Sequence, residues 1–434
     1  MKLNSDTIFA LSSGHGKSGV AVIRISGDNL SAAAAEMAHR DAVTARRAYF
    51  TNLTDENGDL IDQCLVIYFP APHSFTGEDV IEIHSHGAPA VVARIFEYLG
   101  AAGARMATRG EFSRRAFYNN KMDLADVDGL AALLDATTDA QRRAALRSLG
   151  GGDSRIYNAW RDEMVQIAAY AAAILDYDAD DLPVGIGETL RTRTQKLLDD
   201  INGAIARFAA VRAIRDGYNI VLAGRPNVGK SSLFNAIIGS NRAIVSDIAG
   251  TTRDVVDATI DIDGYLVRML DTAGLRDDAT DTIEQIGIER TNDAMRDADL
   301  VIRVFDHGSE CKGYVSDNEI IVVNKSDVCG GVRHPHGIYT SAKTGDGMSD
   351  LMTAIRKKLH DALDARDGDV AINARTRALV VGARDALSAA LGAPDWDIFA
   401  EHVRVAADNI GKILGTITAA DVMDATFSQL CLGK

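Results

Sequence analysis

The first part of the chain mixes strand-like runs with one helical stretch. VAVIRI (20–25), LVIYF (65–69) and VIEIH (80–84) are short apolar runs rich in Val and Ile, which is typical of β-strands. AVVARIFEYLG (90–100) instead repeats its apolar residues with helical spacing. The pattern predicts an α+β domain over residues 1–119.

From Lys121 the pattern becomes helical. The stretch 121–152 ends at a glycine cluster, and its sequence places four apolar residues on one predicted helical face: Leu124, Val127, Leu130 and Leu134. Ala-rich amphipathic stretches around 155–176 and 187–214 continue the pattern and lack the alternation of strands. We expect the first part of an all-α domain over residues 120–214.

At Tyr218 the pattern changes to strand, glycine turn and helix, which repeats through about residue 363. This order predicts an α/β domain with a parallel sheet over residues 215–366. Residues 367–434 return to helical periodicity, but a segment of that size buries little surface alone. We therefore expect it to pack against residues 120–214, so that the α/β domain is an insertion in the helical domain.

Length and composition fit a multidomain protein. A chain of 434 residues is long enough for about three domains of typical length. The 61 acidic and 46 basic residues give a net charge of -15, which argues against coating nucleic acid nonspecifically. The absence of a signal segment or a long apolar run predicts a soluble, cytoplasmic chain without membrane contact. The cysteines form no CxxC pair, as expected for reduced thiols: Cys64, Cys311, Cys329 and Cys431.

A phosphate-binding loop follows the first strand of the α/β segment. NIVLAG (219–224) is an apolar strand, and residues 224–231 after it match GxxxxGK[ST]. In such a loop the backbone N–H groups and Lys230 bind phosphates, and the Ser231 hydroxyl coordinates Mg²⁺. A glycine-rich helix cap is the structural alternative, but the strand, loop and helix context favours nucleotide binding. The predicted nucleotide contacts of this loop are Asn227, Val228, Gly229, Lys230, Ser231 and Ser232.

Selection of guanine is predicted from NKSD (324–327), at the end of the apolar strand EIIVVN. The Asp327 carboxylate can accept from two N–H donors on the edge of guanine, and adenine lacks that pair of donors. We expect Asn324 to brace the loops and the Lys325 stem to lie along the base. Backbone N–H groups of a third segment could bind the guanine carbonyl oxygen: Ser341, Ala342 and Lys343.

Two further loops resemble the switches of GTPases. LVRMLDTAG (266–274) ends a strand with Asp271, which would reach Mg²⁺ through water, and the N–H of Gly274 could hold the γ-phosphate. In SDIAGTTRD (246–254), Thr251 or Thr252 could supply a Mg²⁺ ligand while the γ-phosphate is present. The nucleotide contacts predicted from the two loops are Ser246, Asp247, Ile248, Ala249, Gly250, Thr251, Thr252, Asp271, Thr272, Ala273 and Gly274.

The residue after Gly274 is Leu275, where many small GTPases have a glutamine that orients the attacking water. An apolar side chain cannot hydrogen-bond water, so the catalytic group must come from elsewhere. Besides Lys230 on the phosphates, the candidates are Glu284, Arg276 and a cation held by the side-chain oxygen of Asn227. From the residues alone, each is equally well explained as a solvated charge or a turn residue.

Four segments separate the chain from other GTPases. They are DTIFALSSGHGKSGVAVIRISG (6–27), GEDVIEIHSHG (77–87), FSRRAFYNNKMDLADVDGLAALLDA (112–136) and FSQLCLGK (427–434). With these segments the chain resembles the MnmE (TrmE) family of tRNA modification GTPases along nearly its whole length. The resemblance implies a GTPase that acts with a flavin-dependent partner on the wobble uridine of tRNA. The product carries a carboxymethylaminomethyl or aminomethyl group at carbon 5, and a tetrahydrofolate carries the one-carbon unit.

The resemblance also implies site residues and assembly. The N-terminal domain would bind 5-formyl- or 5,10-methylene-tetrahydrofolate and form a homodimer, which joins the partner protein in a heterotetramer. The matching folate positions are Arg24, Glu82, Lys121 and Lys434. These types suit a pterin edge and an anionic glutamate tail. Without the resemblance, the preferred interpretation makes Arg24 and Lys121 surface charges and Glu82 an ordinary residue on one face of a strand.

For hydrolysis, the resemblance assigns Glu284 to orienting water through a relay. It implies K⁺ ligands at Asn227, Ser246, Ile248 and Thr251, and Mg²⁺ ligands at Ser231 and Thr252. The loop after Gly274 is one residue longer than the family pattern, which leaves Glu289 as the alternative to Glu284. Cys431 lacks an adjacent base, and a tail that packs near the folate site explains it as well as nucleophilic catalysis does.

Two other functions share these motifs. An Era-like regulatory GTPase in ribosome assembly would have every nucleotide motif, but it would need a basic RNA-binding module. A folate-binding scaffold whose nucleotide domain only gates assembly is the third hypothesis. Folate binding separates the tRNA-modifying enzyme and the scaffold from the Era-like GTPase, and analysis of modified nucleosides separates the enzyme from the scaffold.

Overall fold

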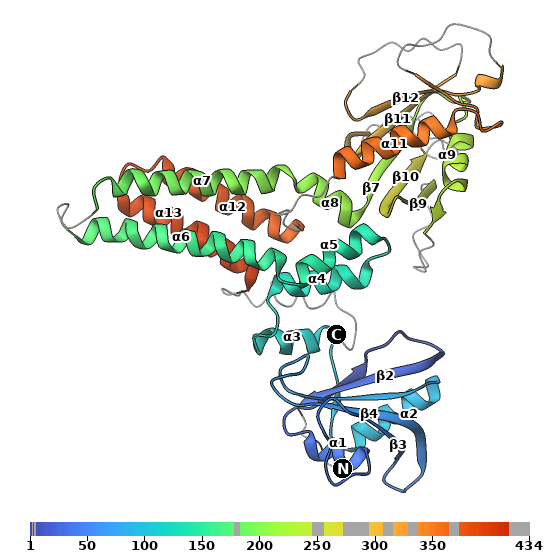
Figure 1. The fold of residues 1–434 in the computed structure, drawn as a ribbon, viewed down its shortest axis with the longest axis vertical. Coiled ribbons are helices and arrows are strands. Elements are labelled where there is room, and N and C mark those ends of the chain that lie inside the picture. Colours follow the sequence, from blue (N-terminus) through green and yellow to red (C-terminus); the bar gives the residue numbers. More distant parts are fainter. Residues whose placement is uncertain are drawn as a thin grey trace, which may run out of the picture. The chain divides into compact units, whose positions relative to one another are not determined.

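The computed structural model of the chain describes residues 1, 3, 6–177, 183–244, 256–271, 295–306, 316–328, 337–363 and 373–415. The chain forms two compact units, whose elements Figure 1 labels. Unit 1 consists of Met1–Ala131, Leu149–Asp162 and Ala407–Lys434. Unit 2 consists of Ala132–Ser148 and Glu163–Ala406.

A six-stranded sheet forms most of the N-terminal part of unit 1, in the order β3-β4-β5-β2-β1-β6. Neighbouring strands are antiparallel except for β1 and β6, which are parallel. The strands are β1 (Ile8–Leu11), β2 (Ser18–Gly27), β3 (Ala48–Thr54), β4 (Leu60–Phe69), β5 (Asp79–Gly87) and β6 (Arg105–Met106). The helices beside them are α1 (Ser31–Met37), α2 (Pro89–Ala101) and α3 (Glu111–Tyr118).

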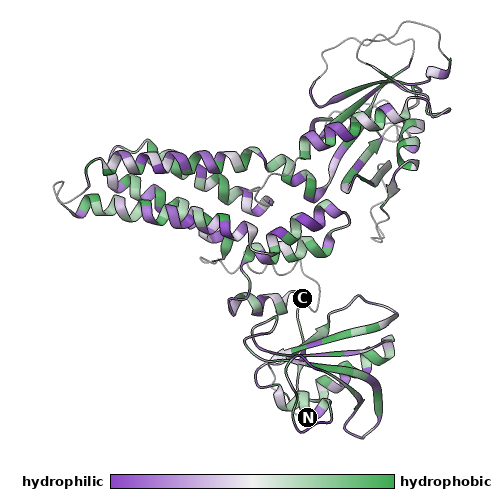
Figure 2. Ribbon diagram, in the orientation of Figure 1, coloured by the Kyte–Doolittle hydropathy of each residue, from purple (hydrophilic) through white to green (hydrophobic). Residues whose placement is uncertain are grey.

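The two faces of this sheet differ because side chains alternate along a strand. Ile23 of β2 and Ile83 of β5 are fully buried in a core that includes Ile95 and Leu99 of α2. Figure 2 shows the hydrophobic residues along these strands in green. The intervening residues of β2 and β5 face the other way, and they include Arg24 and Glu82. The strands and the helix predicted for residues 20–100 are thus confirmed.

The stretch 121–152 forms two helices, α4 (Leu124–Asp135) and α5 (Asp139–Leu149). The side-chain Oε1 of Gln141 accepts hydrogen bonds from the backbone N–H groups of Thr137 (3.0 Å) and Thr138 (3.1 Å), which starts a new helix there. All four predicted apolar residues lie on α4; Leu124, Val127 and Leu130 are buried, Leu134 is 46% exposed, and the break before α5 follows at residues 136–138. Helical spacing alone does not reveal such a break.

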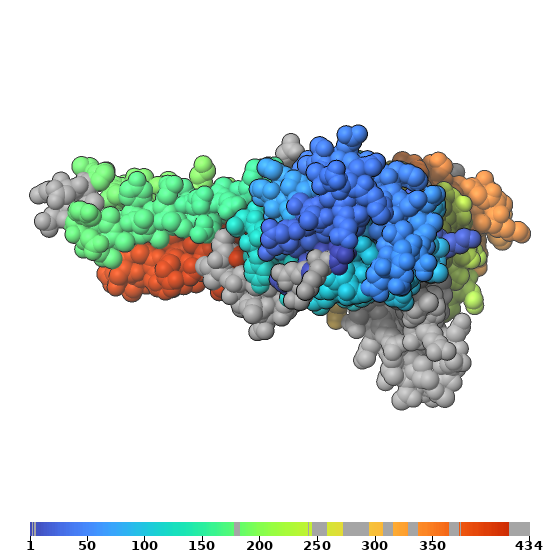
Figure 3. All heavy atoms as spheres, turned by 90° about the horizontal axis from the view of Figure 1, so that it is seen from below, coloured from blue at the N-terminus to red at the C-terminus, as the bar shows by residue number. Residues whose placement is uncertain are grey.

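The other helices of the helical part come from two separate stretches of sequence, one before and one after the α/β segment. They are α6 (Gly152–Asp176), α7 (Ile186–Ala206), α8 (Phe208–Asp216), α12 (Ala374–Leu391) and α13 (Trp396–Leu414). Within unit 2, Arg191 of α7 donates to the carbonyl oxygens of Leu391 (2.8 Å) and Ala393 (3.2 Å). Figures 1 and 3 both show the red C-terminal helices beside the green helices. As predicted, segments before and after the α/β segment pack together.

The α/β segment of unit 2 has a seven-stranded sheet in the order β13-β12-β11-β7-β10-β9-β8. The central strand β7 pairs in parallel with both β10 and β11, and the parallel ladder continues through β12 to β13. The strands are β7 (Tyr218–Ala223), β8 (Arg242–Ala243), β9 (Val256–Ile262), β10 (Tyr265–Asp271), β11 (Leu300–Phe305), β12 (Glu319–Val323) and β13 (Ile338–Tyr339). Helical elements of this segment include α9 (Lys230–Gly239), a 3-10 turn (Ser326–Val328) and α11 (Met348–Leu363).

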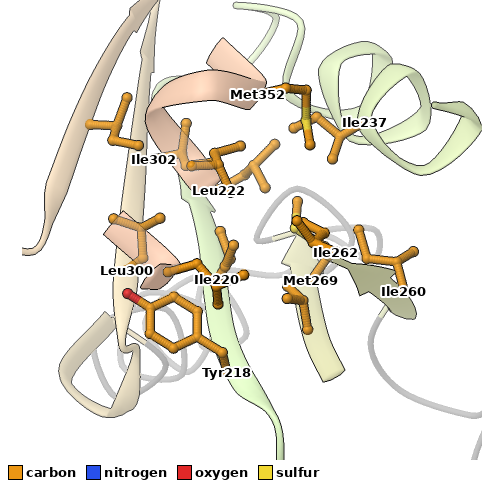
Figure 4. Packing of buried hydrophobic residues seen from close by; sticks show 14 of the residues in the cluster. Tyr218, Ile220, Leu222, Ile237, Ile260, Ile262, Met269, Leu300, Ile302 and Met352 are labelled. Carbon is orange, nitrogen blue, oxygen red and sulfur yellow. The ribbon is translucent and has the colours of Figure 1, made fainter. Parts of the chain in front are cut away.

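The core of the α/β segment joins the sheet to α9 and α11. Figure 4 shows Ile220 and Leu222 of β7 among Ile237 of α9, Met352 of α11 and Met269 of β10. Burial of each such side chain contributes roughly 1.5–3 kcal/mol, so this cluster fixes the strand that carries the phosphate-binding loop.

One helix outside the α/β segment also belongs to this core. Ala140 of α5 is buried in the cluster, and its N–H donates to the carbonyl oxygen of Gly264 in the β9–β10 turn (3.0 Å). The side chain of Gln141 donates to the carbonyl oxygen of Arg215 at the end of α8 (2.7 Å). Helix α5 is therefore packed against the α/β segment within unit 2.

The fold class is the one the sequence predicts: an α+β N-terminal part, a helical part and an α/β segment inserted into the helices. The four residue ranges predicted for the domains (1–119, 120–214, 215–366 and 367–434) stay a prediction. Over the described residues, no helix combines the length and the hydropathy that crossing a membrane requires.

Asp126 provides a test of the fold at the start of α4. Asp123 and Asp126 cap the helix reciprocally, because the carboxylate of each accepts from the backbone N–H of the other (2.9 and 3.0 Å). Burial raises the pKa of Asp126 from 3.8 to about 6, and the charges of Asp123 and Asp153 add to this, although the hydrogen bond from Asp123 lowers it. The ionised carboxyl is therefore destabilising in the folded chain.

We expect Asp126→Asn to stabilise unit 1 at pH 8. The amide keeps an acceptor for the Asp123 N–H and removes the charge. With solvent screening of this half-buried group, the free energy of unfolding should rise by on the order of 1 kcal/mol. Because the folded pKa is raised, the penalty develops as the pH rises through 4 to 6, so the variant and the wild type should unfold alike at pH 4. Calorimetric unfolding at both pH values checks this, with the exposed Asp135→Asn as control. Equal destabilisation at both pH values would refute the electrostatic explanation.

Candidate functional site

The phosphate-binding loop joins β7 to α9 and requires glycine at two positions. Gly224 has φ +158°, and a Cβ there would lie 2.3 Å from the carbonyl oxygen of Val304. Gly229 has φ +93°, and a Cβ there would lie 2.3 Å from the side-chain nitrogen of Asn324. Only glycine avoids both clashes, so the loop approaches β11 and the NKSD segment more closely than another residue would allow.

The side chain of Asn324 joins three loops at the carboxyl ends of the strands. Asn324 is only 2% exposed. Its Nδ2 donates to the carbonyl oxygens of Val228 (3.1 Å) and Gly229 (3.3 Å), and its Oδ1 accepts from the N–H of Ala342 (3.2 Å). The predicted bracing of the loops is present as a set of hydrogen bonds. The N–H of Ala342, predicted to bind guanine, is directed to Asn324 in this structure.

Two lysines are held against the phosphate-binding loop. Lys230 is buried, and its Nζ donates to the carbonyl oxygens of Gly224 and Arg225, both at 3.1 Å. Lys325 donates from Nζ to the carbonyl oxygen of Asn227, at 2.5 Å. Asn227 has a left-handed backbone with φ +64°, a conformation that Asn tolerates better than most residues. The loop thus has two ammonium groups bound to its carbonyl oxygens.

Ser231 and Asp271 bring two oxygen ligands together. The Ser231 hydroxyl donates to the carboxylate of the buried Asp271 over 2.7 Å. Such oxygens suit Mg²⁺, which prefers hard ligands and keeps several waters. Over the described ranges, no group of three or more His, Cys, Asp or Glu side chains could hold a metal ion. Within the described residues, Ser231 and Asp271 are therefore the oxygen ligands that such a site could use, together with phosphate oxygens and water.

Asp327 lies at the same edge of the sheet and is exposed. Its Oδ1 accepts from the hydroxyl of Ser341 (2.8 Å), and that hydroxyl also accepts from the N–H of Thr344 (3.2 Å). Ser341 is fully buried. The loop after β13 therefore orients the carboxylate while leaving it accessible to a planar base.

The structure brings together those nucleotide residues that it describes. The P-loop, Asp271, the NKSD segment and residues 341–343 follow β7, β10, β12 and β13 at one edge of the sheet, with Ser232 and Lys343 exposed. The other predicted nucleotide, metal and catalytic residues lie outside the described residues: Ser246, Asp247, Ile248, Ala249, Gly250, Thr251, Thr252, Thr272, Ala273, Gly274, Arg276, Glu284 and Glu289. Cys431 and Lys434 lie outside them too.

On the polar face of the N-terminal sheet, Arg24 of β2 lies directly opposite Glu82 of β5. Arg24 donates to Glu82 Oε1 from Nε (3.1 Å) and Nη2 (2.9 Å), and its guanidinium lies 4.9 Å from the ring centre of Phe75. The Arg24 side chain is only 13% exposed, so its interpretation as a surface charge is wrong. Within the described residues, its buried Nη1 has no hydrogen-bond partner. A ligand acceptor would satisfy this nitrogen, which fits a folate.

Lys121 belongs to the same part of unit 1. Its Nζ donates to the carbonyl oxygen of Pro72 (3.0 Å), and Pro72 lies in the β4–β5 loop that also contains Phe75. The ammonium is exposed, as a contact for an anionic tail would require. Among the residues that the structure describes, no hydrogen bond or ion pair joins Lys121 to the Arg24–Glu82 pair.

Sequence reasoning did not identify two residues of this cluster. His84 approaches Glu82 with Nε2 at 3.2 Å from Oε2, and Phe75 stacks on Arg24. The period of two along β5 places His84 on the same face as Glu82, so that signal was available. No local pattern predicts Phe75, because it reaches Arg24 across the sheet from a loop.

A separate hollow of about 450 Å³ lies beside α3. Its charges neutralise one another, since Arg105 is paired with Glu111 and Arg115 with Glu78. Burial alone would raise the pKa of Glu111, but hydrogen bonds from Arg105 and the Thr108 N–H outweigh it and lower the pKa to about 2. These pairs stabilise α3 and leave little free charge for a ligand.

Comparison with known proteins covers the whole chain. The family described as GTP-binding protein TrmE N-terminus matches residues 7–121, and the family described as MnmE helical domain matches residues 124–431. A Rhizobium johnstonii protein named tRNA modification GTPase MnmE is 39% identical over 453 residues, and one from Rhizobium meliloti is 40% identical over 446 residues. Both alignments cover 100% of this chain and 100% of the relative.

Among solved structures, Era from Aquifex aeolicus bound to GDP and AlF4- is 23% identical and covers 39% of this chain and 66% of its own. Its TM-score of 0.25 is too low to support an inference. The full-length similarity and the two family matches, in contrast, agree with the motifs along the sequence. The chain belongs to the MnmE family of tRNA modification GTPases.

Proposed function

We propose that this chain binds and hydrolyses GTP at the carboxyl edge of the unit 2 sheet, and that it does so as the GTPase of tRNA wobble uridine modification. One observation carries the proposal. In a chain of the MnmE family, Asn324 joins the phosphate-binding loop to the strand end that bears Asp327. A base and a triphosphate bound there would be held by one connected set of loops.

The base would be recognised by Asp327. Its carboxylate accepts from the ring N–H and the amino group of guanine, which are two donors that adenine cannot present together. The hydroxyl of Ser341 donates a hydrogen bond to one oxygen of that carboxylate. Lys325, anchored on the Asn227 carbonyl, would cover one side of the base with its methylene stem.

The phosphates would lie over the loop that precedes α9. Backbone N–H groups and the helix N-terminus favour anions, and Lys230 would exchange its loop carbonyl contacts for phosphate oxygens. Ser231 would bind Mg²⁺ directly, with Thr252 as the second protein ligand. The metal would neutralise charge on the β and γ oxygens.

In the hydrolytic step, water would attack the γ-phosphorus and the bond to the bridging oxygen would break, which gives GDP and phosphate. We assign the orientation of this water to Glu284, with Glu289 as the alternative, and place Arg276 nearby. A K⁺ ion bound by Asn227 with Ser246, Ile248 and Thr251 would supply the positive charge that an arginine finger supplies elsewhere. These assignments rest on the family pattern.

The remaining parts of the proposal concern the modification. A homodimer of this chain would act with a flavin-dependent partner on cytoplasmic tRNA, and a 5-formyl- or 5,10-methylene-tetrahydrofolate would bind at Arg24, Glu82, Lys121 and Lys434. The buried Nη1 of Arg24, which has no partner among the described residues, supports a ligand at this position. The net charge of -15 suggests that the partner supplies much of the tRNA contact.

The Era-like regulatory hypothesis is not favoured. Similarity to the MnmE proteins extends over the N-terminal and helical parts as well as the nucleotide segment. A GTPase acting in ribosome assembly would share only the nucleotide motifs.

Guanine recognition can be tested with Asp327→Asn. The amide keeps one acceptor but presents N–H to the guanine amino group, so we expect GTP to bind at least tenfold more weakly, since a hydrogen bond to a charged group is worth about 1.5–3 kcal/mol. Xanthosine triphosphate carries a carbonyl oxygen in place of the amino group, so its relative affinity should rise. Competition titrations on the purified chain measure both, with the exposed Asp350→Asn as control. Unchanged preference for GTP would contradict the role of Asp327.

The modification can be tested in cells that lack this gene. We expect mass spectrometry of their tRNA to show loss of the carboxymethylaminomethyl and aminomethyl groups at wobble uridines. Reintroduced wild type and Asp350→Asn should restore the groups, whereas Lys230→Ala should not, because the triphosphate loses its buried cation. Unchanged nucleosides in the deletion strain would refute the proposed function.

A further inference from the structure

The Glu82 carboxylate is held at both of its oxygens. Oε1 accepts from Nε and Nη2 of Arg24, and Oε2 lies 3.2 Å from Nε2 of His84. An ionised carboxylate can only accept hydrogen bonds, so Nε2 must carry a proton in this contact. The imidazole therefore acts as a donor whether or not its other nitrogen is also protonated.

The strand register determines which residues surround this contact. His84 of β5 lies opposite Leu65 of β4 and Val22 of β2, which are apolar. Glu82 lies opposite Arg24 on β2, two residues along the same face. The His84 side chain is 27% exposed and the Glu82 side chain 17%, so water competes only weakly for their hydrogen bond.

The cluster has unused hydrogen-bonding capacity at two atoms. A carboxylate oxygen has about two acceptor positions. Arg24 occupies both on Oε1, whereas His84 occupies one on Oε2. In addition, Nη1 of Arg24 is buried and, within the described residues, has no partner. The cluster thus offers one donor and one acceptor, and the acceptor is the oxygen that His84 holds.

We propose that His84 is a positioning residue, which fixes Glu82 Oε2 so that this oxygen and Arg24 Nη1 together receive a ring lactam of the ligand. The proposal rests on the proposed binding of a folate at Arg24 and Glu82. The pterin ring of a folate has a carbonyl group next to an N–H, and this pair complements the free donor and acceptor.

The physical benefit is preorganisation. A glutamate side chain has three rotatable bonds, and fixing a free one costs binding free energy. Arg24 holds only Oε1, and the hydrogen bond from His84 adds a second restraint on the same carboxylate group. With both oxygens held, Oε2 is already oriented before the ligand arrives.

The test measures binding of 5-formyltetrahydrofolate to the purified full-length chain by calorimetric titration. We expect His84→Leu to weaken binding about tenfold, which corresponds to roughly 1.4 kcal/mol. His84→Gln should recover most of the affinity, because its amide can donate to Oε2. His86→Leu is the matched control, since His86 of the same strand pairs with Asp62 instead (2.8 Å) and should bind as the wild type does.

Thermal unfolding of the same samples separates positioning from stability. The proposal expects His84→Leu to lose affinity without a lower unfolding midpoint. It is overturned if His84→Leu binds as the wild type does, if His84→Gln is as weak as His84→Leu, or if the loss of affinity accompanies a lower midpoint. Glu82→Gln separates the role of His84 from the folate site itself. If Glu82→Gln weakens binding while His84→Leu does not, only the role of His84 is refuted. If Glu82→Gln leaves binding intact, the proposed folate site is refuted as well.

Discussion

The nucleotide site depends on the side-chain amide of Asn324. This amide is buried, and its two ends bond to the phosphate-binding loop and to the loop after β13. The three loops follow different strands. A backbone hydrogen bond from the N–H of Ser326 to the carbonyl oxygen of Thr340 (3.0 Å) joins two of them, and the Asn324 amide joins both to the phosphate-binding loop. Removing a buried partner would leave these carbonyl and N–H groups unsatisfied, at a cost of about 1–3 kcal/mol each. The glycine at position 229 exists in this context, because a side chain there would occupy the space of the amide.

The candidate folate site follows the same principle on an antiparallel sheet. One face of the N-terminal sheet is covered by helices and is apolar, which leaves the other face for polar residues. Arg24 and Glu82 face each other there across β2 and β5, and Phe75 lies under the guanidinium. In both sites, charged or polar side chains are fixed by neighbours before any ligand is present, which lowers the entropic cost of binding.

Much of the fold and part of each site could be predicted from the sequence. The P-loop and NKSD segments have local signatures, and the apolar strands before them place both at one edge of a parallel sheet. What could not be predicted depends on contacts between distant residues. The partial burial of Arg24 requires Phe75, and the break between α4 and α5 depends on a side chain, Gln141, that caps the second helix. Apart from Asp271, the switch residues lie outside the described residues, so their roles stay predictions.

The central claim is that the connected loops form a site for guanine nucleotides. The most direct measurement is displacement of a fluorescent GDP analogue from the purified chain by GTP and by ATP. The account predicts displacement by GTP and none by ATP at about a 100-fold higher concentration, because a site built for hydrogen-bond donors strongly rejects a base that lacks them. Equal displacement by ATP, or failure of the analogue to bind, would contradict it.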